Sequence, residues 1–324
     1  MALSSTVGSF PGDSAESYAE WVKAVFGTLS IPVVPELPGR GVAAGMTGRG
    51  LGLVVELAAD LQPSGWRLAG SSGVDQRRAR SLLSQDLDAV EELAQEWDGP
   101  VKVQVAGPWT LAATVELPRG DKVLGDHGAR RELAASLAEG LRGYVADVRR
   151  RLPGAPRIVV QLDEPVLGAV LGGRVPTASG LHRLRSVDRP ELAGLLDVVL
   201  DGVRESGGEP WVHSCAADTP WDLVHADGLV VDLSVLDAAA TDVFAEALEG
   251  GRTVALGAVP SLDSEVTDKS VTERIERWLD MVGLDPALPG DRVVVTGACG
   301  HANASHAWAR RALAITASTA ANLT

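Results

Sequence analysis

The chain has 324 residues and is 45% hydrophobic, which suits one large α/β barrel or two smaller domains and excludes a disordered chain. Its formal charge of −14 repels phosphate backbones and anionic lipids, so nucleic acids and membranes are not expected partners. We find no transmembrane-length apolar run and no signal peptide, and two cysteines make no disulfide framework. We therefore expect a reduced cytoplasmic protein.

Short apolar runs alternate with longer amphipathic runs from one end of the chain to the other. Expected strands cover residues 5–10, 31–37, 101–107, 157–164, 210–215, 228–234, 253–259 and 292–299. Expected helices cover residues 14–29, 85–97, 129–152, 189–206, 271–282 and 306–323, the first of them beginning after Asp13 as a plausible N-cap. Residues 38–100 are long for one crossover, so we expect an inserted hairpin or helix there.

Eight strand candidates separated by helical runs predict a (β/α)8 TIM barrel in a single domain over residues 1–324. A doubly wound open sheet is the alternative, since periodicity alone does not prove closure. In a barrel the chemistry gathers at the carboxyl ends of the strands. Each strand end in this sequence is therefore a candidate site.

The stretch WVHSC places His213 and Cys215 two residues apart on one strand, so both side chains point to the same face. Cys299 ends the last strand and Asp232 ends the strand that follows WVHSC, so a closed barrel can bring all four together. Nitrogen, sulfur and carboxylate donors in this combination suit a tetrahedral Zn²⁺ ion. A buried, purely structural cysteine is the alternative, and Asp237 competes with Asp232 as the carboxylate.

Seven segments, taken together and in order, resemble the catalytic C-terminal half of cobalamin-independent methionine synthase. They are TVGSFPG, VVPELPG, VAGPWTL, VVQLDEPVL, WVHSC, GLVVDLS and TGACG, and they extend from residue 5 to about residue 305. The resemblance implies a TIM barrel with zinc at its mouth, bound by His213, Cys215, Asp232 and Cys299. It also implies that homocysteine binds zinc through its sulfur and receives a methyl group to become methionine.

The resemblance also assigns residues to the amino-acid substrate. The backbone of Val7, Gly8 and Ser9, with the Ser9 hydroxyl, would hold the substrate carboxylate, and Glu36 and Asp163 would hold its ammonium group. The alternatives are structural: Glu36 lies between prolines in a possible solvated loop, and Asp163 begins a possible turn.

Four departures from the family concern the metal and the methyl donor. The third zinc ligand of the family is glutamate, and Asp232 stands in its place. The family histidine after the seventh strand is missing, so Asp263 nearby, or His301 or His306 from the last loop, would act instead. Third, the folate site is matched only weakly: its pterin-stacking tryptophan falls near Thr114, with Trp109 nearby but offset, and its Arg-Cys pair corresponds only faintly to Arg67-Leu68. Fourth, we find no second, N-terminal barrel.

The thiol half of the site therefore matches better than the methyl-donor half. A methyl-folate or a methyl-corrinoid, the latter carried on a corrinoid protein, is the expected donor. Rival interpretations are zinc-dependent alkyl transfer to another thiol such as coenzyme M, a metal-free uroporphyrinogen decarboxylase, and a non-catalytic protein that binds zinc or an amino acid. The acidic strand ends disfavour the decarboxylase, which needs arginines for its many carboxylates.

Overall fold

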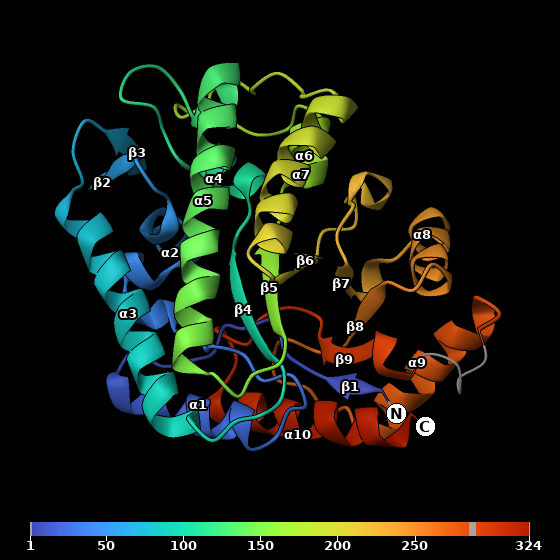
Figure 1. Ribbon diagram of the computed structural model, residues 1–324. Helices are drawn as coiled ribbons and strands as arrows, with labels where there is room; N and C mark the ends of the chain where they lie inside the picture. The colour runs from blue at the N-terminus through green and yellow to red at the C-terminus, as the bar shows by residue number, and fades with distance from the viewer. Residues whose placement is uncertain (1, 285–289, 324) are drawn as a thin grey trace.

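A computed structural model describes residues 2–284 and 290–323 of the chain. Parallel strands form one curled seven-stranded sheet in the order β1–β9–β8–β7–β6–β5–β4 (Figure 1). These strands are β1 (Leu3–Ser4), β4 (Val101–Ala106), β5 (Ile158–Asp163), β6 (Glu209–Ser214), β7 (Gly228–Asp232), β8 (Thr253–Val259) and β9 (Val293–Gly297). The α/β class and the parallel sheet expected from the sequence are confirmed.

Helices connect successive strands and pack on the outside of the sheet, where apolar faces cover it (Figure 1). They are α1 (Ala15–Phe26), α2 (Met46–Leu53), α3 (Val74–Ala94), α4 (Pro108–Thr114), α5 (His127–Arg151), α6 (Leu167–Leu171), α7 (Arg189–Glu205), α8 (Ala238–Glu249), α9 (Asp268–Met281) and α10 (His306–Asn322). The sequence did not predict α4, α6 or α8, and it placed the start of α3 too late. The N-cap of α1 is Ser14, which accepts from the Ser17 N–H, rather than Asp13.

Residues 31–37 were expected to form a strand, but segment 31–36 makes only isolated bridges to its neighbours. The Ile31 N–H donates to the Ser4 carbonyl at 2.9 Å, and the Val34 N–H donates to the Lys102 carbonyl at 2.9 Å. The segment therefore bonds to both edges of the sheet, beside β1 and beside β4. The two prolines in IPVVP explain the missing regular strand, because proline has no N–H to donate.

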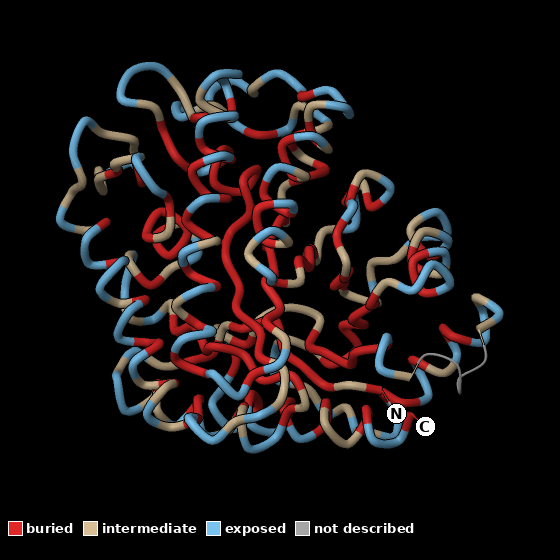
Figure 2. The backbone as a smooth tube through the Cα atoms, viewed as in Figure 1, coloured by how far each residue is buried: buried red, intermediate tan, exposed pale blue. Residues whose placement is uncertain are grey.

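A small apolar cluster fills the inside of the curled sheet, and most of the sheet is buried on both faces (Figure 2). The cluster takes one buried residue from most strands: Ile31, Val159, Trp211, Val230, Ala255 and Val294, with Leu3 packed against them. These residues come from segments far apart in the chain. The sheet is therefore curved strongly enough for its inner face to form its own core.

Residues 38–100 contain α2, the antiparallel hairpin of β2 (Ala58–Gln62) and β3 (Gly65–Ala69), and α3. The buried Gln76 side chain of α3 ties these elements together, since it donates to the Leu51 and Leu57 carbonyls and accepts from the Ala59 N–H. No helix within residues 2–284 and 290–323 has the length and apolar character needed to cross a membrane.

Candidate metal centre

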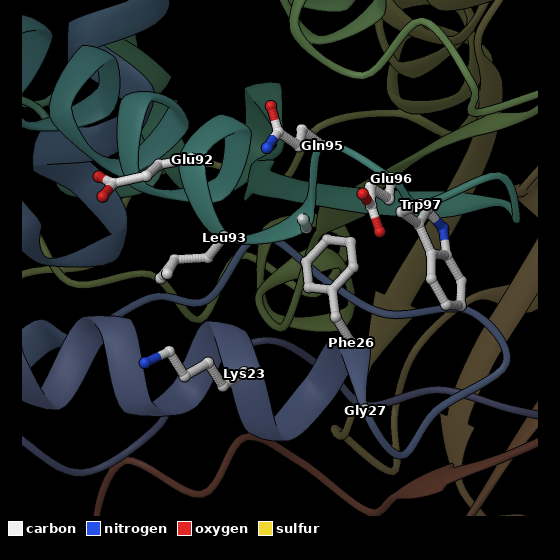
Figure 3. Close-up of a pocket in the computed structure, with 9 residues that line it drawn as sticks. Lys23, Phe26, Gly27, Glu92, Leu93, Gln95, Glu96 and Trp97 are labelled. Atoms are coloured by element: carbon white, nitrogen blue, oxygen red, sulfur yellow. The ribbon is translucent and has the colours of Figure 1, made fainter.

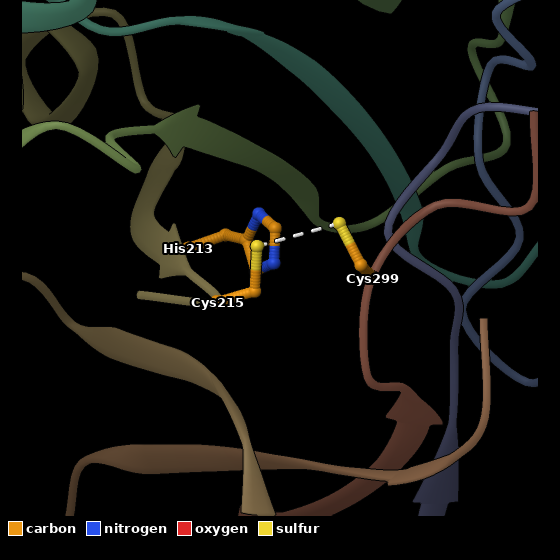
Figure 4. Close-up of side chains that lie close together, drawn as sticks. All are labelled: His213, Cys215 and Cys299. Atoms are coloured by element: carbon orange, nitrogen blue, oxygen red, sulfur yellow. Dashed lines mark hydrogen bonds between the residues drawn. The ribbon is translucent and has the colours of Figure 1, made fainter. Parts of the chain in front are cut away.

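Three side chains of types that can bind a metal meet at the carboxyl ends of the sheet strands (Figure 4). His213 lies in β6, Cys215 directly follows that strand, and Cys299 follows β9. One donor atom from each residue lies within 4.8 Å of the others, and the two sulfurs are 3.5 Å apart. The structure thus brings together three of the four ligands that the sequence pattern pointed to.

The imidazole of His213 is buried and held by Asp163 from the neighbouring strand β5. Its Nδ1 lies 2.8 Å from Asp163 Oδ1, so an ionised carboxylate requires the proton to be on Nδ1. The other ring nitrogen, Nε2, is buried and has no hydrogen-bond partner among the described residues. A buried polar atom without a hydrogen-bond partner destabilises the fold. A zinc-binding histidine usually donates its other ring N–H to a carboxylate, as His213 does to Asp163, and cysteine sulfurs are common zinc ligands. The donor set therefore fits zinc.

Cys215 and Cys299 are both free and partly exposed. The hydrogen bond between the two thiols lowers the pKa of Cys215, and the nearby His213 adds to that effect. The same hydrogen bond, together with burial, raises the pKa of Cys299. One sulfur thus gives up its proton more readily, and the thiolate is the form that binds a metal.

Asp232 ends β7 but lies outside this cluster of donors. Its Oδ1 accepts from the Ser234 N–H at 2.8 Å and from the Ser234 hydroxyl at 2.7 Å, which caps a short 3₁₀ turn. Its charge still acts on Cys215, whose pKa it tends to raise. The competing Asp237 caps α8 through the Ala240 N–H. Within the described chain the clustered donors are three, the number of protein ligands that a catalytic zinc site uses.

The segment Val7–Ser9 lies against the loop that carries Cys299. The Ser9 carbonyl accepts from the His301 N–H at 2.8 Å. Gly8 has φ of +138°, and the Gln104 side chain leaves no room for a Cβ there, so glycine is required. The N–H groups of Gly8 and Ser9 donate no hydrogen bond within the described part of the chain. Two unpaired N–H groups in succession suit an anionic group.

Glu36 is buried, so the solvated-loop alternative is wrong. Its Oε1 accepts from Arg49 Nε at 2.9 Å, and Arg49 also donates to Asp86 at 2.7 Å. Burial raises the pKa of Glu36, and the charge of Asp163 adds to that effect, while Arg49 opposes it. The two carboxylates expected to bind the ammonium group are therefore electrostatic neighbours.

Asp263 and His301, the expected proton carriers, lie in different surroundings. Asp263 is exposed and accepts the N–H and the hydroxyl of Ser305, at 2.9 and 2.5 Å. Those bonds hold Ser305, the N-cap residue of α10, and lower the pKa of Asp263, which makes it a poorer proton donor. His301 is buried, its Nδ1 lies 3.2 Å from the Ser261 carbonyl, and burial lowers its pKa. Of the two, His301 belongs to the cysteine-bearing loop.

Sequence reasoning missed the buried polar residues below the site. Lys102 in β4 and Gln161 in β5 are almost inaccessible and hydrogen-bond to each other at 2.6 Å. Glu164 accepts from the Trp109 and Thr110 N–H groups, both at 2.8 Å, and so fixes the start of α4. A signal was present, because polar residues alternate with apolar ones in VKVQVA and VVQLDE and so share one face.

A surface cavity of about 540 Å³ is lined by the end of α1 and the end of α3 (Figure 3). Its lining includes Lys23 and Phe26 of α1 and the residues Glu92 to Trp97 at the end of α3. Both helix ends precede strand-forming segments, so the cavity is at the amino ends of the strands. Chemistry at the carboxyl ends does not use it.

Comparisons with known proteins point in one direction. Residues 89–322 match the family model described as "Cobalamin-independent synthase, Catalytic domain". A B12-independent methionine synthase from Shewanella sp. W3-18-1, solved in complex with selenomethionine, is 14% identical, with a TM-score of 0.62 and coverage of 99% of this chain and 97% of that one. A putative vitamin-B12-independent methionine synthase from Listeria monocytogenes is 12% identical, with a TM-score of 0.59 and coverage of 98% and 95%. No curated protein sequence matches.

The two solved structures are too distant in sequence to carry more than the fold, but the family model covers most of the chain. The cluster His213, Cys215 and Cys299 lies within the matched residues 89–322. The chain therefore belongs to the cobalamin-independent methionine synthase family and is a methyltransferase of that type.

Proposed function

We propose that this chain methylates the sulfur of homocysteine to give methionine, with zinc bound by His213, Cys215 and Cys299. The observation that carries the proposal is the buried, partnerless Nε2 of His213 beside two cysteine sulfurs. Bound zinc would favour the thiolate form of a substrate thiol, which is the reactive form near neutral pH. Asp232, the fourth ligand expected from the sequence, caps a turn through Ser234, so these three residues would hold the ion without it.

The chain's own residues would bind and orient the amino acid. The unpaired N–H groups of Gly8 and Ser9, with the Ser9 hydroxyl and the adjoining Val7, suit its carboxylate. The carboxylates of Glu36 and Asp163 suit its ammonium group. Asp163 uses Oδ1 to hold His213, and its Oδ2 makes no hydrogen bond within the described residues. The Shewanella relative was solved with selenomethionine, an analogue of the proposed product, which supports an amino-acid site.

His301 is the better candidate for carrying a proton in the reaction. Its Nδ1 donates to the Ser261 carbonyl, which leaves Nε2 to accept or deliver the proton. Asp263 is the weaker candidate, because its bonds to Ser305 favour the carboxylate that has already lost its proton.

We also infer that the sheet closes into the eight-stranded barrel of a single domain, with residues 38–100 as a long insertion after the second strand. Two observations support closure: segment 31–36 bonds to both edges of the sheet, and the interior cluster includes Ile31 with residues of the other strands. In a closed barrel the carboxyl ends of β6 and β9 would face one common mouth.

The methyl donor is either a methyl-folate or a methyl-corrinoid delivered by a corrinoid protein. Trp109 is buried and its ring N–H donates to the Leu192 carbonyl, so its face is covered rather than open to a pterin. Arg67, the other residue with a weak match to the folate site of the family, forms an ion pair with Glu116. These contacts weigh against a folate bound as in the full-length enzymes and favour testing both donors.

Methionine formation from homocysteine tests the proposal, with methyltetrahydrofolate and methylcobalamin supplied separately. We expect turnover with one donor, loss of both turnover and zinc in His213→Asn, and retention of both in His225→Asn. His225 is the matched control, because it is an exposed histidine paired with an aspartate. A zinc-loaded wild type that uses neither donor would instead support the non-catalytic binding protein.

A second thiol substrate is the remaining alternative, and charge separates it from homocysteine. Coenzyme M carries a sulfonate and no ammonium group, so it gains nothing from Glu36 or Asp163. We expect Glu36→Gln to raise KM for homocysteine and to leave any activity on coenzyme M unchanged. Faster turnover of coenzyme M by the wild type would reverse the substrate assignment.

A further inference from the structure

A continuous chain of hydrogen bonds runs below the metal centre, from a buried lysine to the zinc-binding histidine. Lys102 Nζ donates to Gln161 Oε1 at 2.6 Å and to the Val7 carbonyl at 3.1 Å. Gln161 Nε2 in turn donates to Asp163 Oδ1 at 2.7 Å and to the same Val7 carbonyl at 3.1 Å. Asp163 Oδ1 lies 2.8 Å from His213 Nδ1. Three adjacent strands, β4, β5 and β6, supply this chain.

Lys102 sets the direction of the hydrogen bonds in this series, because a charged amino group only donates hydrogen bonds and accepts none. Gln161 must therefore turn its carbonyl oxygen toward Lys102 and its NH₂ group toward Asp163. A flipped amide would put Oε1 against two acceptors, the Asp163 carboxylate and the Val7 carbonyl, and would face NH₂ toward the amino group. The contacts with Lys102, Val7 and Asp163 together thus remove the usual ambiguity of a glutamine side chain.

The orientation of Gln161 bears on the tautomer of His213. With the Gln161 NH₂ group donating to it, Asp163 Oδ1 remains an acceptor in the direction of the imidazole. His213 then carries its proton on Nδ1, and Nε2 keeps the lone pair that a metal requires. Without Lys102, the amide of Gln161 loses one of the three contacts that fix its orientation, and the constraint on the tautomer weakens.

We propose that Lys102 is a positioning residue for the metal centre: through Gln161 and Asp163, it holds His213 in the tautomer with a bare Nε2. The inference rests on the zinc site of the proposed function, but it does not depend on the methyl donor or the substrate. Burial lowers the pKa of Lys102 to about 7. After loss of the proton, two N–H groups remain for its two acceptors, and the Val7 carbonyl and Asp163 still oppose a flipped Gln161 amide.

The test compares three substitutions by methionine, which keep side-chain length and remove hydrogen bonding. Lys102→Met and Gln161→Met interrupt the chain of hydrogen bonds. Gln104→Met is the control, because Gln104 is buried two residues along β4 from Lys102 and donates to the Val34 carbonyl instead. Thermal unfolding confirms that each variant folds, and Gln161→Met still tests the chain if Lys102→Met does not fold.

The first measurement is the nitrogen-15 NMR spectrum of zinc-free protein labelled at its six histidines. We expect the wild type and Gln104→Met to have His213 protonated at Nδ1 only, and Lys102→Met and Gln161→Met to have averaged shifts from mixed tautomers. The second measurement is zinc affinity in competition with a chromophoric chelator, where both chain-breaking variants should bind about 10- to 100-fold more weakly than the control.

Unchanged histidine shifts and unchanged zinc affinity in a folded Lys102→Met variant would overturn the inference, as would a wild type protonated at Nε2. The two proposals fail separately. If the wild type binds no zinc but Lys102→Met still changes the tautomer, the proposed function is lost and the positioning role stands. If zinc binds normally and both chain-breaking variants match Gln104→Met, only the positioning role is lost.

Discussion

Arg49 connects Glu36 to a buried cluster of charges, and replacing it is expected to destabilise the fold strongly. Its Nε donates to Glu36 Oε1 at 2.9 Å, and its Nη1 donates to Asp86 Oδ2 at 2.7 Å. Arg40 makes two further bonds to Asp86, at 2.7 and 2.8 Å. The Arg49 and Asp86 side chains are 3% and 1% exposed, so water cannot replace these partners.

Arg49→Met keeps most of the aliphatic length of the side chain and removes both charge-assisted hydrogen bonds. Each such bond contributes about 1.5–3 kcal/mol, and breaking a buried ion pair from one side costs about 3–5 kcal/mol. We therefore expect the free energy of unfolding to fall by about 3–5 kcal/mol. For 324 residues the unfolding entropy is about 0.7 kcal/mol per kelvin, which converts this loss to a Tm decrease of about 4–7 °C.

Equilibrium unfolding in urea and calorimetry measure the two quantities. Arg142→Met is the matched control, since Arg142 also contacts two carboxylates, Glu139 and Glu205, but on the surface. Surface pairs contribute about 0–1 kcal/mol, so the control should stay close to the wild type. If Arg49→Met proves no more destabilising than Arg142→Met, the buried charge cluster does not stabilise the fold as reasoned here.

Three further predictions concern packing, pH and the metal. In α5, Gly140→Ala should destabilise the protein by about 1–3 kcal/mol, because the new Cβ would overlap the Leu53 carbonyl. At Gly143 a new Cβ has no neighbouring atom, so Gly143→Ala should stabilise the protein by up to about 1 kcal/mol. Urea unfolding measures both effects. The pKa of Lys102 is near 10.5 in the unfolded chain and about 7 in the fold, so between pH 7 and 9 the unfolded state binds the extra proton. Wild-type stability relative to Lys102→Met should then rise by about 2–3 kcal/mol over that range, and a flat or falling difference would contradict the assignment. Asp232→Ala should retain zinc at one per chain after dialysis, because Ser234 already occupies its Oδ1, while Cys215→Ser should lose it.

The order of the elements was predictable because the strands are buried on both faces and read as short apolar runs. Segment 31–36 could not be assigned correctly, since its apolar residues indicate a strand while its prolines leave only isolated bridges. Helix α8 was missed because its apolar positions in AAATDVFAEALE are mostly alanine, which gives a weak periodic signal. Its cap at Asp237 was read instead as a possible metal ligand.

The cluster of candidate metal ligands was predictable in part, because His213 and Cys215 share one strand face by simple alternation. Cys299 joined them only through the expected topology and the family resemblance. What the sequence could not reveal was which carboxylates are already engaged: Asp163 holds His213, and Asp232 caps a turn. Which partner a carboxylate hydrogen-bonds to depends on the three-dimensional contacts around it, and residue types and spacing alone do not determine those contacts.

Zinc K-edge X-ray absorption of the purified protein, with and without homocysteine, tests the central claim most directly. The account predicts bound zinc with one imidazole and the two cysteine sulfurs, and one additional sulfur at about 2.3 Å when homocysteine is added. A protein that binds no zinc, or a sulfur count that homocysteine leaves unchanged, would contradict it.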